Sequence, residues 1–264
     1  MTTFSLYLAT GAFAGLFAGL LGVGGGLIVV PILAWILATQ GVAPEHVMHL
    51  AIGTSLATII PTAISSLRAH HARDAVDWVL VRRITPGIAL GCLAGAWFAT
   101  QLETGTLKLI LAIFQFYVGT QMLLDFAPNP SRGLPLDLGM TLVGAIIGVL
   151  SSLIGIGGGT LSVPWMVWCN KGMRQAVGTA SAIGLPIAIF GSAGFVLTGL
   201  SIGSLPAHSL GFVYLPALAG IALASVFTAP FGAVLAHRLP VDVLKKVFAI
   251  LLYALGTKML LTAI

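Results

Sequence analysis

Residues Gly22 to Pro31 read GVGGGLIVVP, and this stretch decides how the rest of the chain is organised. It occurs twice, because residues Gly155 to Pro164 read GIGGGTLSVP, with each glycine and the proline in step 133 residues later. Both copies lie in long apolar segments, where a run of glycines lowers helix stability. A costly feature that is present in both halves of a chain calls for a functional explanation.

The composition is that of a membrane protein. The 264 residues are 58% hydrophobic and 7% charged, whereas soluble domains carry about 25% charged residues. The apolar segments are apolar all round, so they do not have the alternating pattern of β-barrel strands. The net charge of +5 does not indicate nucleic-acid binding, because the basic residues lie in short loops without interleaved aromatic residues. The sequence therefore predicts an all-α polytopic protein whose surroundings are the lipid bilayer.

The first apolar segment and the cysteines carry little further chemistry. No Lys or Arg precedes Arg68, so the start of the chain lacks the positive region of a cleavable signal peptide. We expect Phe4 to Leu21 to remain as a membrane segment. Cys92 and Cys169 lie in apolar surroundings without metal-ligand spacing, and we expect both to be small core residues.

The chain divides into ten apolar elements, five on each side of a proline-rich stretch. The first half, residues 1–126, contains Phe4–Leu21, Leu27–Ala38, Val47–Leu67, Val79–Thr100 and Thr106–Leu124. Residues 127–137 are predicted to be a cytoplasmic linker. The second half, residues 138–264, contains Leu138–Ile154, Thr160–Cys169, Gln175–Thr198, Leu210–Ala236 and Val241–Ala263.

Further matches between the halves indicate an internal duplication. Residues 51–54 read AIGT and residues 176–179 read AVGT, 125 positions later. Residues 119–124 read GTQMLL and residues 256–261 read GTKMLL, 137 positions later. Matching blocks in one order at nearly constant offset predict two homologous membrane repeats.

An odd number of elements per repeat predicts that the second repeat is inserted upside down. Successive loops lie on alternate sides of the membrane. If the loop that carries Arg68 and Arg73 is cytoplasmic, most other basic residues are then cytoplasmic too, and Lys108 and Lys258 lie outside. Both termini are then predicted to be non-cytoplasmic, in a cell inner membrane.

The second element of each repeat is too short to span a bilayer. Leu27–Ala38 would reach about 18 Å, against a hydrocarbon core of about 30 Å. The first two elements of each repeat are therefore expected to form a broken or re-entrant pair that meets at the glycines. Such interrupted segments at corresponding positions are typical of a transporter's substrate site.

The glycine motifs favour an anion site at the start of two short helices. Free backbone N–H groups and the positive end of the helix dipole converge there, and the absent side chains let an anion approach. Close helix packing is the alternative explanation of these glycines. The predicted backbone contacts are Gly24, Gly25, Gly26, Gly157, Gly158 and Gly159.

Polar side chains near these motifs could contact or steer the anion. The predicted hydroxyl ligands are Thr54, Ser55, Thr179 and Ser181, although hydroxyls in membrane helices often bond to a carbonyl of their own helix. The predicted gating or steering residues are Pro31, Pro164, His49 and Arg174, of which the last two could equally be interfacial residues.

Several chemistries lack the residues that they would need. All seven acidic residues lie in loops or at helix ends, so no carboxylate within a span is available for proton or cation transport. Residues 70–74 read HHARD, which is better explained as a basic turn than as a metal site. No nucleophile and base stand at a spacing typical of a hydrolase, so we expect neither an enzyme nor a cofactor or metal.

The chain resembles the TauE/SafE sulfite exporter family of transporters. The resemblance covers nearly the whole chain and rests on the paired glycine motifs, the two Gly-Thr motifs, and His70, Arg73 and Val76-Asp77-Trp78. It implies a permease for small sulfur-containing anions such as sulfite or organosulfonates, usually in the direction of export.

The sequence thus predicts a secondary transporter that binds a small oxyanion between two glycine-rich helix starts and works by alternating access. A passive anion channel on the same fold remains an alternative. A membrane protein that handles sulfur through Cys92 or Cys169 is a further alternative.

Overall fold

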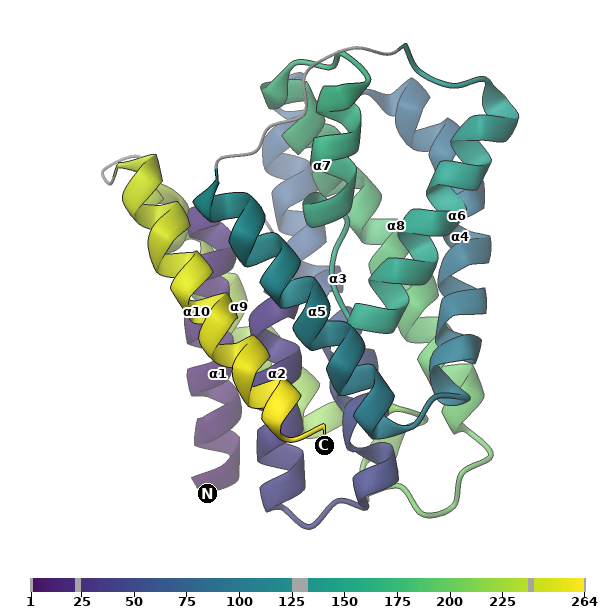
Figure 1. Ribbon diagram of the computed structural model, residues 1–264, viewed down its shortest axis with the longest axis vertical. Helices are drawn as coiled ribbons and strands as arrows, with labels where there is room; N and C mark the ends of the chain where they lie inside the picture. Colours follow the sequence, from purple (N-terminus) through teal and green to yellow (C-terminus); the bar gives the residue numbers. More distant parts are fainter. Residues whose placement is uncertain (1, 22–24, 125–132, 237–239, 264) are drawn as a thin grey trace.

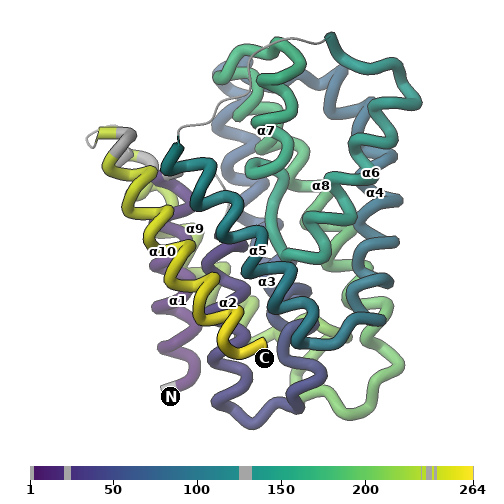
Figure 2. The backbone as a smooth tube through the Cα atoms, viewed as in Figure 1, coloured from purple at the N-terminus to yellow at the C-terminus, as the bar shows by residue number. Residues whose placement is uncertain are grey.

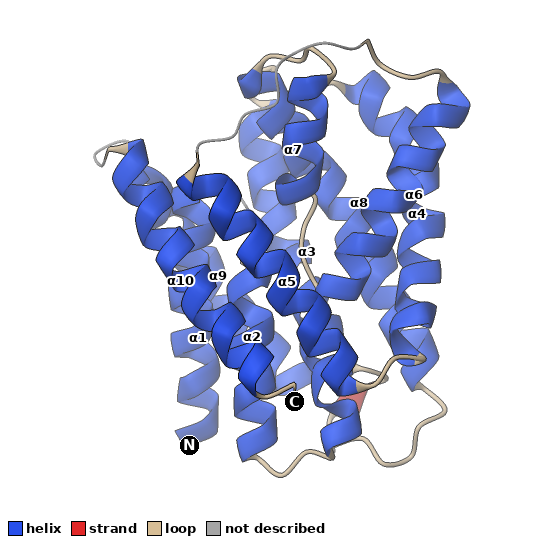
Figure 3. Cartoon of the chain, viewed as in Figure 1, coloured by secondary structure: helices blue, strands red, loops and turns tan. Residues whose placement is uncertain are grey.

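The computed structural model describes residues 2–21, 25–124, 133–236 and 240–263, and these residues are almost entirely helical (Figure 1, Figure 3). Seven of the described helices are long and apolar enough to cross a membrane. The predicted all-α polytopic membrane fold is therefore confirmed.

The five elements expected in the first half are all helices. They are α1 (Thr2–Leu21), α2 (Gly26–Thr39), α3 (Pro44–His71), α4 (Trp78–Thr100) and α5 (Thr104–Leu123). Local sequence explains two of the helix starts. Pro44 occupies the first turn of α3, where its missing N–H costs nothing. The Asp77 carboxylate accepts a 3.0 Å hydrogen bond from the Leu80 N–H and so caps α4.

The second half repeats this order with one difference. Its helices are α6 (Asp137–Ile154), α7 (Gly159–Trp168), α8 (Met173–Gly199), α9 (Leu215–Ala236) and α10 (Val241–Leu261). The prediction of a helix from Leu210 was wrong at its start, because β1 (Ser209–Leu210) and β2 (Val213–Tyr214) form a small antiparallel hairpin before α9. Gly211, with φ +54°, makes this turn, which apolar composition alone does not distinguish from helix.

The two halves pack against each other along most of their length. The helices α1 and α9, α3 and α8, α4 and α6, and α5 and α10 form the main pairs. Small residues allow the close approach. A Cβ atom on Gly87 or Gly91 would overlap the backbone of α6, and one on Gly144 or Gly148 would come equally close to the backbone of α4.

Each short helix runs in the opposite direction to the helix before it, and α2 also packs against α1 (Figure 1). Both chain termini lie at one end of the molecule, where α1 begins and α2 ends (Figure 1, Figure 2). Helix α6 begins and α7 ends at the opposite end. With 14 and 10 residues, α2 and α7 are about 21 and 15 Å long, so each returns from the interior to its own end. The inverted relation of the two repeats, to which these directions conform, stays a prediction.

Candidate functional site

The two glycine turns touch each other inside the molecule. A Cβ atom on Gly26 would overlap the carbonyl oxygen of Gly155 and lie 3.0 Å from the Cα of Ile156. Ser55 from α3 joins the contact, because its hydroxyl donates a 2.9 Å hydrogen bond to the Gly155 carbonyl. Gly155 itself has φ +79°, which ends α6 in a left-handed turn that suits glycine. Gly24 lies outside the described residues.

Both short helices begin without a side-chain cap. The residues before the first helical positions are Gly25 and Gly158, and neither offers a side-chain acceptor to the first turn. The Gly25 carbonyl accepts hydrogen bonds from Ile28 and Val29 at 3.0 and 2.9 Å, as a normal helix start requires. The positive ends of two helix dipoles therefore lie in the protein interior, where such ends favour negative charge.

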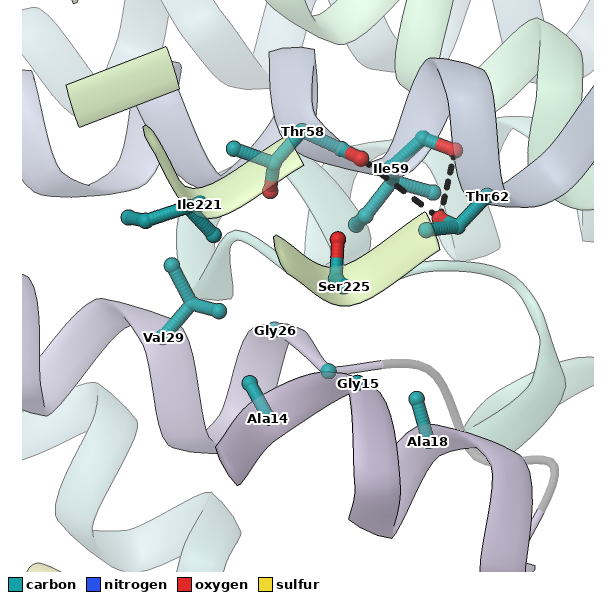
Figure 4. Close-up of a pocket in the computed structure, with 11 residues that line it drawn as sticks. Ala14, Gly15, Ala18, Gly26, Val29, Thr58, Ile59, Thr62, Ile221 and Ser225 are labelled. Atoms are coloured by element: carbon teal, nitrogen blue, oxygen red, sulfur yellow. Dashed lines mark hydrogen bonds between the residues drawn. The ribbon is translucent and has the colours of Figure 1, made fainter. Parts of the chain in front are cut away.

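A cavity opens beside the first glycine turn (Figure 4). It is small, with a cavity volume of about 20 Å³, and it is partly open to the outside. Gly26 lies at one wall, and the hydroxyl-bearing residues Thr58, Thr62 and Ser225 lie across from it (Figure 4). Gly25 also lines the cavity. The remaining lining residues are uncharged and small or aliphatic, namely Ala14, Gly15, Ala18, Val29, Ile59 and Ile221.

The three hydroxyls each donate to a carbonyl of their own helix. Thr58 donates to Ser55 at 2.7 Å, and Thr62 donates to Ile59 at 2.9 Å (Figure 4). Ser225 donates to Ala222 at 3.1 Å. A hydroxyl hydrogen rotates freely, so each group can redirect its hydrogen bond to a ligand that accepts more strongly. The cavity thus combines a helix N-terminus with mobile hydrogen-bond donors and no charged side chain.

Comparison with known proteins identifies the family. The family model described as "Sulfite exporter TauE/SafE" matches residues 7–259. This chain belongs to the TauE/SafE family. A "Probable membrane transporter protein" of Haemophilus influenzae is 37% identical over 99% of this chain and 100% of its own length. A protein of the same description from Methanocaldococcus jannaschii is 26% identical over 97% of this chain and 95% of its own. No solved structure matches the chain significantly.

In this TauE/SafE protein the Gly-Thr motifs dock loops of the opposite half. The Thr54 hydroxyl accepts a 2.9 Å hydrogen bond from the Tyr214 N–H, and the Thr179 hydroxyl accepts a 3.0 Å hydrogen bond from the Asp77 N–H. The glycine before each threonine lets a loop carbonyl come close, from Phe212 in one case and Ala75 in the other. The ligand role predicted for these threonines stays a prediction.

The other predicted polar ligands are also engaged within the protein. Ser55 bonds to Gly155, as described above. Ser181 donates to the Val177 carbonyl and accepts from the Ser66 hydroxyl, both at 3.1 Å. The predicted backbone contacts of the second motif lie at the start of α7 and are Gly157, Gly158 and Gly159. They directly follow Gly155 and Ile156, which contact Gly26.

The predicted gating residues occupy very different surroundings. Pro31 is buried inside α2, and Pro164 is partly buried inside α7. His49 is buried near the start of α3, with its ring nitrogens 2.8 Å from the Glu45 carbonyl and 3.1 Å from the Ala99 carbonyl. Arg174, at the start of α8, is exposed and donates to the Arg73 carbonyl at 2.8 Å.

Sequence reasoning missed the residues that line the cavity. Thr58 and Thr62 follow Thr54 at intervals of four, so helical spacing could have found them. Ser225 lies in a predominantly apolar helix, and no motif marks it. Gln115 on α5 was also missed: its buried side-chain NH₂ donates a 2.9 Å hydrogen bond to the Leu27 carbonyl and so fixes the first turn of α2.

The residues of the competing chemistries are packed away. Cys92 and Cys169 are buried, and the Cys92 Sγ lies 3.6 Å from the Gly148 carbonyl oxygen. Among the described residues no group of three His, Cys, Asp or Glu side chains could hold a metal ion. Neither observation gives the site a redox or metal chemistry.

Proposed function

We propose that this chain is a secondary transporter that exports small sulfur-containing oxyanions, such as sulfite or organosulfonates, across the cell inner membrane. The observation that carries the proposal is the cavity at the start of α2, where a helix N-terminus faces three hydroxyls without any charged side chain. Membership of the TauE/SafE family and relatives described as membrane transporters support the general class.

The chemistry of the cavity suits a small anion. Backbone N–H groups and the helix dipole at Gly26 attract negative charge, and Thr58, Thr62 and Ser225 supply donors to its oxygens. A permanent positive charge would hold the anion more tightly and slow its release, so an uncharged site suits transport. The aliphatic remainder of the wall can contact the carbon atoms of an organosulfonate.

Alternating access requires a site between two gates. The cavity lies beside the contact of the two glycine turns, and α2 and α7 leave that contact toward opposite ends of the molecule (Figure 1). Small movements of α1 and α2 against α6 and α7 would expose the same anion first to one side of the membrane and then to the other. The passive channel differs from this mechanism in having one continuous path.

Counterflow in liposomes tests the transport class. Protein reconstituted into liposomes loaded with unlabelled sulfite should accumulate external labelled sulfite transiently, under oxygen-free conditions. A carrier gives this overshoot because unlabelled substrate leaving the liposome returns the binding site to the outer face. Uptake that rises to equilibrium without an overshoot would identify a channel, and absence of any sulfite flux would contradict the proposed substrate.

Variants of the cavity test the proposed site. Thr58→Val and Thr62→Val keep the side-chain shape but remove a donor, so each should weaken sulfite binding by about 10- to 100-fold, the worth of a hydrogen bond to a charged group. Gly25→Ala should narrow the cavity while the fold tolerates it, because its Cβ would lie 3.4 Å from the Ala14 Cβ and carbonyl oxygen. Thr198→Val is the matched control, since Thr198 also donates to its own helix, at 2.8 Å, but does not line the cavity. Binding by all three cavity variants that equals the control would exclude this site.

A further inference from the structure

The start of α7 contains buried hydroxyls that the first glycine turn does not have. The side chains of Ser151 and Ser162 are 0% exposed, and within the described part of the chain neither hydroxyl has a hydrogen-bond partner. An unpaired buried hydroxyl is unfavourable, so two of them beside one turn indicate that a partner of a different kind belongs there.

The two serines lie in the helices on either side of the second glycine turn. Ser162 lies one helical turn after Gly158, and its Oγ is 3.3 Å from the place that a Cβ on Gly158 would take. Ser151 is in the last turn of α6, where its carbonyl accepts the N–H groups of Gly155 and Ile156 at 2.8 and 3.1 Å. The two hydroxyls therefore belong to the two helices that the second glycine turn connects.

Two glycines beside this helix start are loosely packed. Among the described residues outside its own helix, a Cβ atom added to Gly184 of α8 would have one neighbour within 4 Å, the backbone nitrogen of Gly158 at 3.8 Å. A Cβ on Gly157 would meet only side-chain carbons of Ile59, at 3.6 and 3.9 Å. Beside Gly157 and Gly184 the packing at the start of α7 is therefore loose, whereas the side chains of Ile183 and Ile187 lie over Gly158.

Equivalent positions of the two halves show a reversed arrangement of polar groups. The repeat offsets of 133 and 125 residues match residues around the first turn with residues around the second. Contacts of the equivalent glycines match α9 with α4: Gly11 lies against the Ile221 carbonyl, and Gly144 lies against the Ile84 carbonyl. The apolar cavity residues Ala18, Val29 and Ile59 correspond to Ser151, Ser162 and Gly184. The hydroxyl-bearing cavity residues Thr58, Thr62 and Ser225 correspond to Ile183, Ile187 and Ile88.

We propose that the start of α7 is a second binding station for the same class of small oxyanion. Its donors are the hydroxyls of Ser151 and Ser162 together with the first amides of α7, whereas at the first station the hydroxyls come from α3 and α9. The identity of the ligand rests on the proposed function. Two stations with donors from different helices let an anion pass from one to the other as the helices move, without ever meeting a charged side chain.

The reversed arrangement also explains why one station is open while the other is closed. In this conformation Ile183 and Ile187 pack over the second turn, within 3.3 and 3.1 Å of the Cβ position of Gly158. The corresponding Thr58 and Thr62 line an open cavity at the first turn. The conformation described here therefore has the first station accessible and the second one enclosed.

Crystals soaked in sodium selenite test the second station directly. Selenite has the shape and charge of sulfite, and its selenium gives an anomalous signal that water does not give. We expect a selenium peak beside Ser151 and Ser162 in addition to one beside Thr58 and Thr62, in wild-type crystals or in crystals of a variant trapped in the opposite conformation. A peak at the first turn alone in both conformations would overturn the second station, and a peak at the second turn alone would overturn the proposed first site.

Transport by matched variants provides an independent readout. Ser151→Ala/Ser162→Ala should bind sulfite at the first station within about twofold of wild type, yet lose at least tenfold in counterflow. The control is Ser192→Ala, because Ser192 is a buried serine whose hydroxyl donates to its own helix, at 2.6 Å. Ser151→Ala/Ser162→Ala removes only unpaired hydroxyls, so it should not lower the melting temperature. A lowered melting temperature would therefore reveal a folding defect.

The outcomes separate the two proposals. Counterflow of the double serine variant that equals the Ser192→Ala control would overturn the second station and leave the proposed function intact. A wild-type protein that shows selenium at both turns but no sulfite flux would contradict the transport function and leave the two stations standing. A wild-type protein without selenium at either turn would contradict both.

Discussion

At the scale of single residues, the contact between the glycine turns depends on the absence of one side chain. Gly26 lies against the carbonyl oxygen of Gly155 and the Cα of Ile156, so there is no space for a methyl group between the two backbones. The neighbouring Gly25 has only ordinary contacts at its Cβ position. Two adjacent glycines of one motif therefore have different surroundings, because Gly25 lines the cavity and Gly26 lies against the second glycine turn.

Gly26→Ala should destabilise the folded protein strongly. The added methyl group forces backbone away from backbone, and overpacking of this kind costs about 1 to 3 kcal/mol or more. Thermal unfolding in detergent measures the effect, with Gly203→Ala as control because nothing lies within 4 Å of its Cβ position. Equal melting temperatures of the two variants would contradict the direct contact of the turns.

At the scale of elements, two threonines hold the starts of the fourth helices of both halves. Thr54 on α3 accepts the Tyr214 N–H just before α9, and Thr179 on α8 accepts the Asp77 N–H just before α4. Both threonines are buried. These two hydrogen bonds tie α3 to the segment before α9 and α8 to the segment before α4.

Thr54→Val and Thr179→Val should each lower the free energy of unfolding by about 1 to 3 kcal/mol, because each leaves a backbone N–H of a packed loop without its acceptor. Valine keeps the shape of threonine, so packing changes little. Chemical or thermal unfolding compares both variants with Thr10→Val, whose hydroxyl donates to the Leu6 carbonyl of its own helix. A loss that does not exceed that of the control would show that the docking hydrogen bonds are unimportant.

An ion pair joins three elements at the end opposite to the termini. Lys171, in the loop between α7 and α8, lies 2.8 Å from the carboxylate of Asp77, which caps α4. Burial by itself raises the pKa of Asp77, but the hydrogen bond and charge of Lys171 and the Leu80 N–H outweigh it and hold the pKa below its ordinary value. A carboxyl group with a lowered pKa in the folded state stabilises the fold above its ordinary pKa.

Asp77→Asn should therefore lower the melting temperature at neutral pH, because asparagine keeps the helix cap but loses the ion pair. The difference from wild type should stay constant at neutral pH and vanish only as the pH falls below the ordinary carboxyl pKa, where Asp77 of the wild type becomes protonated. Melting curves from neutral to strongly acidic pH measure this, with the exposed Glu103→Gln as control. A difference that is independent of pH throughout would rule out the ion pair as its cause.

At the scale of the whole molecule, charge is divided between the two ends. The loops with Arg73, Lys171 and Arg174 lie at the end opposite to the termini, whereas Lys108 and Lys258 lie near the end that holds the termini (Figure 1). Lys108 donates to the carbonyl of Thr262, so one of these two side chains also tethers the last residues of α10. This division is what a predominantly positive cytoplasmic side requires.

We expect both termini to be non-cytoplasmic. In a Cys92→Ala/Cys169→Ala background, the Gly203→Cys variant should react with a membrane-impermeant maleimide added to intact cells. The Arg73→Cys variant should react only after the cells are opened. The reverse labelling pattern would contradict this orientation.

Much of this architecture could be predicted from local sequence. The apolar runs gave nine of the ten helices closely within the described residues, and the start of α9 was missed because composition does not distinguish a short apolar hairpin from helix. The glycine motifs located the centre of the candidate site. The hydroxyls that face the cavity were missed, because the side of a buried helix that lines a cavity depends on its neighbours.

The sequence by itself determined the membrane class and the positions of the two matching glycine turns, because hydropathy and helix-breaking residues are local properties of the chain. Only the tertiary structure decided that the turns touch, that Thr54 and Thr179 bond to backbone, and that Thr58, Thr62 and Ser225 share a cavity. These facts depend on how α3, α8 and α9 pack across the two halves. Contacts between residues more than a hundred positions apart are set by the packing of whole helices, which no local pattern contains.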